Sequence, residues 1–224
     1  MNKEDMKIEN LYDLTHTMAG GFMKQYEFPW EILPHIGEMI EELGKNLSSD
    51  EYNQYGTNVW IHKSVEMPPT ACVKGPLIIC KDAEIRQCAF IRGNVLVGEG
   101  ATVGNSTELK NVILFDRVQV PHYNYVGDSI LGYKSHMGAG SITSNVKSDK
   151  QLVRVHGEDG DIETGLKKFG AMLGDCVEVG CGSVLNPGTV VGKNSNIYPL
   201  SSVRGCVNGN SIYKKQGEIV EKRL

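Results

Sequence analysis

Large aliphatic residues recur at every sixth position through the middle of the chain. Each step of six from Ile61 to Leu109 falls on an aliphatic residue or methionine, and mostly smaller residues lie two positions before. The same pattern returns from Leu173 to Val203. This period fits neither an α-helix nor an alternating strand. It predicts a chain that turns a corner every six residues, a mainly β fold built as a left-handed parallel β-helix of hexapeptide repeats.

Glycine often follows the inward aliphatic residue, as at Gly98, Gly104 and Gly180. Corners of the coil need positive φ, which glycine adopts at little steric cost. We therefore expect these glycines to form corners. The register slips by one residue at Leu114 and by one more at Leu131.

The repeat fails between the two regular runs. Residues 146–167 are charged and punctuated by glycine, with weak alternation at 152–155 and a turn-like "HGEDG". We expect an inserted loop or hairpin at about 146–167. Insertions in solenoids tend to gather on one face, often the binding face.

The first 55 residues follow a different pattern. The apolar spacing is that of one face of a helix, with Ile36, Met39, Ile40 and Leu43. Pro34 near the start and Gly44 at the end fit helix boundaries. We predict a short amphipathic helix docked on the first coils. We assign 1–55 to a helical segment, 56–205 to the β-helix and 206–224 to a C-terminal tail.

Charge and composition narrow the classes of function. The net charge is −4 and the lysines are scattered, which gives no basic face for nucleic acid. The first residues are charged where a signal peptide needs an apolar core, and no apolar run approaches a membrane span. We expect a cytoplasmic protein without a membrane or nucleic-acid partner. Six cysteines form no CxxC pair, which favours reduced, packing cysteines over disulfides or a zinc site.

A histidine stands out where the register slips, in "PHYNYVGD" at residues 121–128. His122 lies among Tyr123, Asn124 and Tyr125, just before the inward Val126. A lone histidine in a strand is more often structural than catalytic, so these residues alone leave both interpretations open. Cations upstream can stack onto the same patch, because residues far apart in sequence meet on successive coils.

The segment "HYNYVGDSILGYKSHMGAGSITSN" resembles the glucosamine-1-phosphate acetyltransferase half of the bifunctional enzymes that make UDP-N-acetylglucosamine. The resemblance runs from Arg92 to Asn145 and resumes at Lys168 in "KKFGAMLGDCVEVGCGS". The interrupted form is more similar to archaeal-type sugar-phosphate nucleotidylyl/acetyltransferases. The resemblance implies an acyltransferase that uses acetyl-CoA as co-substrate, needs no metal and works as a homotrimer with sites between subunits.

The resemblance also implies roles for single residues. His122 takes the place of the general base that deprotonates the sugar amine as it attacks the thioester. Arg92 and Lys110 match the cations that bind the sugar phosphate. Further positions that match substrate contacts are Tyr125, His136, Asn145 and Lys168. Positions that match acetyl-CoA contacts are Ala139, Cys181, Pro199, Lys214 and Lys215; Tyr123 and Asn124 are interpreted as structural.

Three departures from the family lie near the acceptor. His136 stands where the family usually has asparagine, Val146 stands where it has tyrosine, and the loop at 146–167 is much longer. The identity of the amino sugar therefore stays open. We expect no pyrophosphorylase half, since too few residues precede the first coil for a nucleotide-binding α/β domain. We expect no nucleotidyl transfer.

Two other classes of function stay open. A γ-carbonic anhydrase shares this β-helix but needs three histidines brought together, two of them closely spaced. His62, His122 and His136 are widely spaced. A non-catalytic scaffold is the second alternative. The joint presence of the base, both phosphate cations, Asn145 and Lys168 argues against it.

Overall fold

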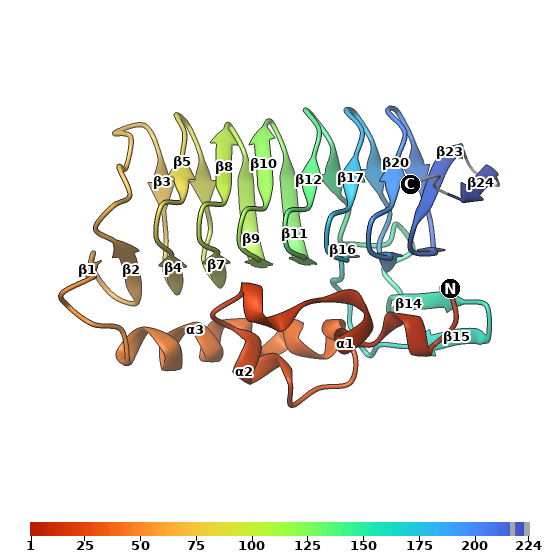
Figure 1. Cartoon of the computed structure of the whole chain (residues 1–224), viewed down its shortest axis with the longest axis horizontal. Coiled ribbons are helices and arrows are strands. Elements are labelled where there is room, and N and C mark those ends of the chain that lie inside the picture. The colour runs from red at the N-terminus through yellow and green to blue at the C-terminus, as the bar shows by residue number, and fades with distance from the viewer. Residues whose placement is uncertain (216–217, 222–224) are drawn as a thin grey trace.

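The computed structural model, which describes residues 1–215 and 218–221, is a parallel β-helix with a helical segment along one side (Figure 1). Successive coils pair in parallel and in register, as Val59 with Leu77 and Leu77 with Val95. The predicted fold class is confirmed: mainly β, hexapeptide repeats wound into a β-helix, a short N-terminal helical segment and an inserted hairpin.

The coil has three faces that the chain visits in turn. The first face holds β3 (Cys72–Val73), β6 (Phe90–Ile91), the start of β9 (Glu108–Leu114), the start of β11 (Tyr125–Leu131), β13 (Ile142–Thr143), β18 (Val184–Leu185) and β21 (Ser202–Val203). The second holds β2 (Val59–His62), β4 (Leu77–Ile79), β7 (Val95–Val97), the ends of β9 and β11, β16 (Ala171–Leu173), β19 (Thr189–Val191) and β22 (Cys206–Val207). The third holds β5 (Glu84–Ile85), β8 (Thr102–Asn105), β10 (Gln119–His122), β12 (His136–Met137), β17 (Glu178–Val179), β20 (Asn196–Ile197) and β23 (Ser211–Lys215).

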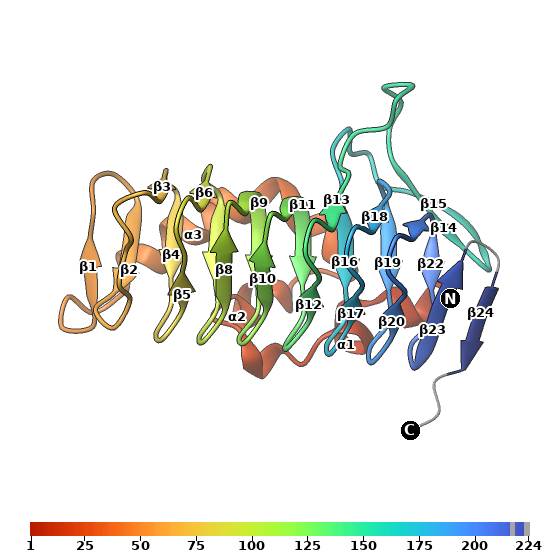
Figure 2. The same ribbon diagram turned by 90° about the horizontal axis from the view of Figure 1, so that it is seen from above.

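Antiparallel strands stand at both ends of the stack and in the insertion. β1 (Tyr52–Gln54) pairs with β2, and β24 (Glu218–Glu221) pairs with β23. The coil thus continues past residue 205 through β22 and β23, and residues 216–217 and 222–224 of the expected tail lie outside the described residues. Within 146–167, β14 (Arg154–Gly157) and β15 (Gly160–Glu163) form a hairpin. Figure 2 shows the insertion leaving the stack after β13.

The helical segment lies against the second face (Figure 1). It comprises η1 (Glu4–Met6), α1 (Ile8–Leu11), η2 (Leu14–His16), α2 (Gly20–Met23), η3 (Pro29–His35) and α3 (Ile36–Lys45). Helix α3 buries Ile36, Met39 and Ile40, as the apolar spacing predicts. Asp175 also ties the segment down: its carboxylate accepts hydrogen bonds from the Asp13 N–H (2.7 Å) and the Tyr133 N–H (2.9 Å). The segment and the coil therefore share one hydrophobic core.

The repeat positions account for the core. The inward aliphatic residues that are buried include Ile61, Ile79, Ile85, Ile91, Val97, Val103 and Leu109. Met67 and Val73 in the first coil are only partly buried. Small polar residues beside the aliphatic ladder, such as Ser141 and Ser183, are fully buried and bonded to backbone carbonyls.

The register slips arise at one corner. Between Ile91 and Val97 the chain turns through a two-residue corner, Gly93 and Asn94, both at positive φ. In β9 and β11 the strand runs unbroken from the first face to the second through a single positive-φ residue, Asn111 or Asp128. Each of these coils is therefore one residue shorter, which moves Leu114 and Leu131 out of the six-residue register.

The expectation that Gly98, Gly104 and Gly180 supply positive φ is wrong. Positive φ occurs at other residues, including Gly100 and Gly182. Instead, a Cβ on Gly104 would overlap the backbone of Pro121 in the next coil, and one on Gly180 would meet Pro199. Glycine is needed at these positions because the next coil comes too close for any side chain.

Substitution Gly104→Ala should lower the free energy of unfolding by about 1–3 kcal/mol or more, because the new methyl group must displace backbone rather than a flexible side chain. Gly21→Ala is the matched control, since nothing lies within 4 Å of the added Cβ. Urea denaturation of both variants measures the difference. Equal stability of the two variants would contradict this packing account.

Candidate functional site

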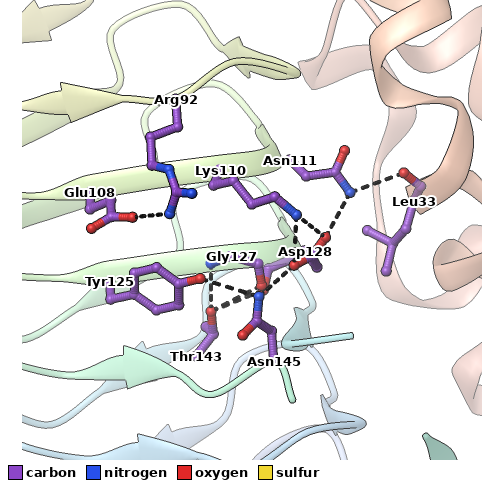
Figure 3. Close-up of polar contacts among 11 residues, drawn as sticks. Leu33, Arg92, Glu108, Lys110, Asn111, Tyr125, Gly127, Asp128, Thr143 and Asn145 are labelled. Carbon is purple, nitrogen blue, oxygen red and sulfur yellow. Dashed lines mark hydrogen bonds and ion pairs between the residues drawn. The ribbon is translucent and has the colours of Figure 1, made fainter. Parts of the chain in front are cut away.

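A nearly buried carboxylate organises the edge between the first and second faces (Figure 3). The Asp128 side chain is 5% exposed and accepts hydrogen bonds from Lys110 Nζ at 3.0 Å and Asn111 Nδ2 at 3.0 Å. Asn145 Nδ2 also donates to Asp128. Asn111 Nδ2 further donates to the Leu33 carbonyl, which joins this edge to η3. We call this corner the Asp128 edge.

The short corners of β9 and β11 place these side chains together. Lys110 pairs with Gly127 in register, so the residues that follow, Asn111 and Asp128, stack on successive coils. Their φ values are 58° and 47°. Asparagine and aspartate tolerate this left-handed conformation better than most side chains do. The geometry thus follows from the same slip that breaks the six-residue count.

Arg92 and Tyr125 extend the cluster across the first face. Phe90, Glu108 and Tyr125 are in register on successive coils. Arg92 Nη1 donates to Glu108 Oε1 at 2.7 Å, and this hydrogen bond raises the pKa of the Arg92 guanidinium. Asn145 Nδ2 donates to the Tyr125 hydroxyl at 3.2 Å. Burial, with a smaller contribution from the Asp128 charge, raises the pKa of Tyr125, so its phenol stays protonated near neutral pH.

Both cations keep hydrogen-bonding capacity for a ligand. The Lys110 ammonium has three N–H donors, and its recorded partners are the two oxygens of Asp128. Arg92 has five donors, is 46% exposed at its side chain and meets one oxygen of Glu108. An anion can therefore bind Arg92 and Lys110 while both cations keep their carboxylate partners.

His122 lies on the other side of the first face, at the corner that leads from the third face. It ends β10 and its side chain is exposed. The His122 carbonyl accepts from the Gly140 N–H at 3.0 Å, the Ala139 carbonyl accepts from the Gly182 N–H at 2.9 Å, and the Cys181 carbonyl accepts from the Leu200 N–H at 2.9 Å. The structure thus stacks His122, Ala139, Cys181 and Pro199 on successive coils, a corner that we call the His122 edge.

Asn124 fixes the backbone at His122. Its side chain is 2% exposed; Oδ1 accepts from the His122 N–H at 3.1 Å, and Nδ2 donates to the Gly138 carbonyl at 2.9 Å. Nδ2 also reaches the Ser141 carbonyl at 3.1 Å. The buried amide therefore holds the His122 corner against the next coil.

The remaining predicted site residues fall in three places. Lys168 is exposed and precedes Phe169, whose N–H donates to the Asn145 carbonyl at 3.0 Å. Lys214 and Lys215 follow Tyr213, the register partner of Ile197, which places them one coil beyond Pro199. His136 is not in the cluster: it lies on the third face, where Nδ1 meets Glu178 Oε2 at 2.8 Å.

Three polar members of the Asp128 edge, Glu108, Asn111 and Asp128, were missed by the sequence interpretation. The signal that could have found Asn111 and Asp128 is the register slip, because each stands at the single-residue corner of a short coil. Glu108 lies two residues before Lys110, on the same strand.

Other classes of site gain no support from the described residues. Residues 1–215 and 218–221 hold no cluster of three His, Cys, Asp or Glu side chains arranged for a metal ion. Over the same residues, none of the helices has the length and apolar character needed to cross a membrane. The six cysteines are free, and Cys72, Cys88 and Cys181 are exposed rather than packed.

Substitution Asp128→Asn should lower the free energy of unfolding by about 1–3 kcal/mol, because a buried acceptor of several N–H groups becomes partly a donor that faces them. Asp82→Asn is the control: Asp82 is an exposed corner residue with a φ of 55°. Thermal or urea unfolding provides the comparison. If both variants unfold alike, Asp128 does not hold this edge together.

Comparisons with known proteins find similar sequences among bifunctional GlmU proteins and related bifunctional enzymes. Residues 73–173 match the family described as the GMPPB C-terminal domain. The Methanococcus vannielii bifunctional protein GlmU is 32% identical over 206 residues, which span 91% of this chain and 50% of the relative. A Sulfurisphaera tokodaii bifunctional sugar-1-phosphate nucleotidylyltransferase/acetyltransferase is 29% identical over 160 residues, 63% of this chain and 40% of the relative.

A solved structure supports the fold independently. The product of the BC4754 gene of Bacillus cereus, a candidate acetyltransferase, aligns with a TM-score of 0.54 at 17% identity, over 69% of this chain and 85% of that one. The chain spans about half the length of the curated relative from Methanococcus vannielii. It is a hexapeptide-repeat β-helix protein, homologous over that half to the bifunctional GlmU proteins.

Proposed function

We propose that the chain is an acetyl-CoA-dependent N-acetyltransferase acting on an amino-sugar phosphate such as glucosamine-1-phosphate, with His122 as general base. The observation that carries the proposal is the arrangement of the first face. Its Asp128 edge gathers Arg92, Lys110 and Asn145, and its His122 edge stacks the residues proposed to contact the coenzyme. A sequence identity of 32% with a GlmU protein supports the same activity.

The chemistry of the Asp128 edge suits a sugar phosphate. Arg92 and Lys110 retain donors for phosphate oxygens, and charge-assisted hydrogen bonds to phosphate are about twice as strong as neutral ones. The protonated Tyr125 phenol and the Asn145 amide offer neutral groups next to these cations. Lys168, beside Asn145 through the Phe169 backbone, adds a third cation to the proposed acceptor site.

The chemistry of the His122 edge suits a thioester and an attacking amine. His122 is exposed, with its backbone fixed by the buried Asn124, so the imidazole can meet a ligand from a fixed position. Ala139, Cys181 and Pro199 are exposed and stand on the coils that follow. A row of small or apolar side chains beside backbone groups suits the pantetheine arm of coenzyme A. Lys214 and Lys215 lie beyond Pro199, where they can bind the phosphates of the coenzyme. His136, on the third face, enters the site only if a neighbouring copy contributes it.

The proposal includes a homotrimer whose sites lie between copies. Large apolar side chains are exposed along the His122 edge, with exposed fractions of 64% for Tyr123, 45% for Tyr198 and 85% for Leu200. Exposed apolar groups gathered on one edge are typical of an interface. A neighbouring copy on this edge would bury them and close the open side of His122.

Substitution His122→Ala should reduce acetyl transfer to an amino-sugar phosphate by about 10²–10⁴-fold, because the amine loses its base. Binding of coenzyme A, measured by calorimetry, should stay unchanged. Thioester cleavage is followed over a panel of amino-sugar phosphates and nucleotide-linked amino sugars. The control is His62→Ala, a histidine on the first coil, which should keep normal turnover.

Three results would count against parts of this proposal. Near-normal turnover of the His122→Ala variant would exclude His122 as the base. Coenzyme binding by the unmodified protein without turnover on any acceptor would instead favour a non-catalytic scaffold. Stoichiometric zinc in the purified protein would favour the metal-enzyme alternative.

Sedimentation should give a mass about three times that of the 24.6 kDa chain. Leu200→Asp should shift the protein towards monomer and reduce acetyl transfer, because a charge cannot be buried at the proposed interface without a partner. Leu152→Asp, at another exposed leucine outside this edge, should remain trimeric. A monomer in the unmodified protein at micromolar concentration would refute the shared site.

A further inference from the structure

The insertion forms a pocket beside the Asp128 edge that no residue of the proposed acceptor or coenzyme site lines. Its volume is about 260 Å³. The wall on the coil side comes from residues that flank or follow Asn145, including Ser144, Asn186 and Arg204. The wall on the insertion side includes Lys147, Arg154 and His156. We call it the insertion pocket.

The register places the insertion pocket on the same edge as the phosphate cations. Lys110 pairs with Gly127, and the Ser144 and Asn186 N–H groups donate to the Leu185 and Val203 carbonyls, so the column continues from Ser144 to Asn186 and Arg204. Coils are spaced by about 4.8 Å, which places Arg204 about 10 Å along the edge from Ser144. The proposed acceptor site and the insertion pocket therefore meet at Asn145.

The insertion side of the pocket is held rigidly. Val153 and Val155 are buried in the main core, and the alternation of a strand turns Arg154 and His156 outward between and after them. A Cβ on Gly188 would meet the Arg154 carbonyl, and one on Gly205 would come within 3.7 Å of His156 Cβ. The strand thus lies directly on the coil corner, and its polar side chains are positioned by packing.

The lining carries more cations than carboxylates. Lys147, Arg154 and Arg204 are cations and His156 adds an imidazole, whereas Asp149 is the one carboxylate that lines the pocket. Arg154 meets Glu163, Lys147 meets Asp149 and His156 Nδ1 meets Asp161 Oδ1 at 2.7 Å, but these pairs are exposed and such pairs contribute little to stability. Arg204 is exposed and has no ion pair within the described residues. The unmatched guanidinium is the strongest indication of an anionic ligand.

We propose that the insertion pocket is a second anion subsite that binds a phosphate or diphosphate group, adjacent to and separate from the Arg92–Lys110 cations. Guanidinium groups from two different elements can meet phosphate oxygens in a forked geometry. The shared border at Asn145 favours the acceptor as the source of this group. This assignment rests on the proposed function. The acceptor is then an amino sugar linked to a diphosphate, and the cations along the edge bind its phosphates.

Calorimetric titration with inorganic pyrophosphate tests the subsite directly. Arg204→Ala and Arg154→Ala should each raise the Kd about ten-fold, the loss expected for one charge-assisted contact. Arg117→Ala is the matched control, since Arg117 is an exposed corner arginine between the second and third faces. In the Arg92→Ala background, Arg204→Ala should still raise the Kd for pyrophosphate, because the two sites are separate. Absence of pyrophosphate binding, or equal Kd values for Arg204→Ala and Arg117→Ala, overturns the subsite.

Steady-state kinetics identify the source of the phosphate. A raised KM for a diphosphate-linked amino sugar in Arg204→Ala, with the KM for acetyl-CoA unchanged, supports the acceptor. A raised KM for acetyl-CoA alone supports the subsite but overturns its assignment to the acceptor. If no acceptor is acetylated while pyrophosphate binding still depends on Arg204, the proposed activity fails and the anion subsite stands.

Discussion

Hydrogen bonding between coils about 4.8 Å apart is the constraint on which the rest of this structure depends. Each coil must match the next in register, so a coil that is one residue shorter at a corner shifts the six-residue count of every later coil by one position. The spacing also fixes which side chains fit. Gly104 is glycine because the backbone of Pro121 occupies the place of its Cβ. The interior aliphatic ladder stabilises the stack, but the backbone ladder decides where any side chain can point.

The candidate site uses this constraint at the two corners where coils are short. Running β9 and β11 unbroken around the edge leaves a single residue to make the turn, and that residue is polar in both cases. Asn111 and Asp128 thereby become buried or nearly buried at the surface of the stack. A buried carboxylate needs partners, and it finds them in Lys110, Asn111 and Asn145. The same contacts fix the positions of Lys110 and Asn145 and attach the edge to the helical segment through Asn111 and Leu33.

The insertion adds chemistry to this edge without disturbing the stack. Two buried valines hold the hairpin to the core, so its cations are presented from a strand rather than from a free loop. Lys110, Asn145 and the insertion pocket then lie along one continuous edge. The three departures from the resembled family, at positions 136 and 146 and in the long loop, lie in two different places. Val146 and the loop line the pocket, whereas His136 lies on another face, paired with Glu178.

The six-residue spacing of aliphatic residues was enough to predict the β-helix, because a period of six sustained over many steps fits a chain that turns a corner every six residues and fits neither a helix nor a simple alternating strand. The family resemblance around His122 similarly predicted Arg92 and Lys110 as phosphate-binding cations, and it predicted the residues that the structure stacks on the His122 edge. Only the tertiary structure decided the rest. Which residues adopt positive φ depends on the backbone of the neighbouring coil, and the partners of Asp128 come from separate coils and the helical segment. The charge around the insertion pocket depends on where the hairpin packs against the coil. No local pattern encodes that position, because contacts between distant segments depend on the packing of the whole chain.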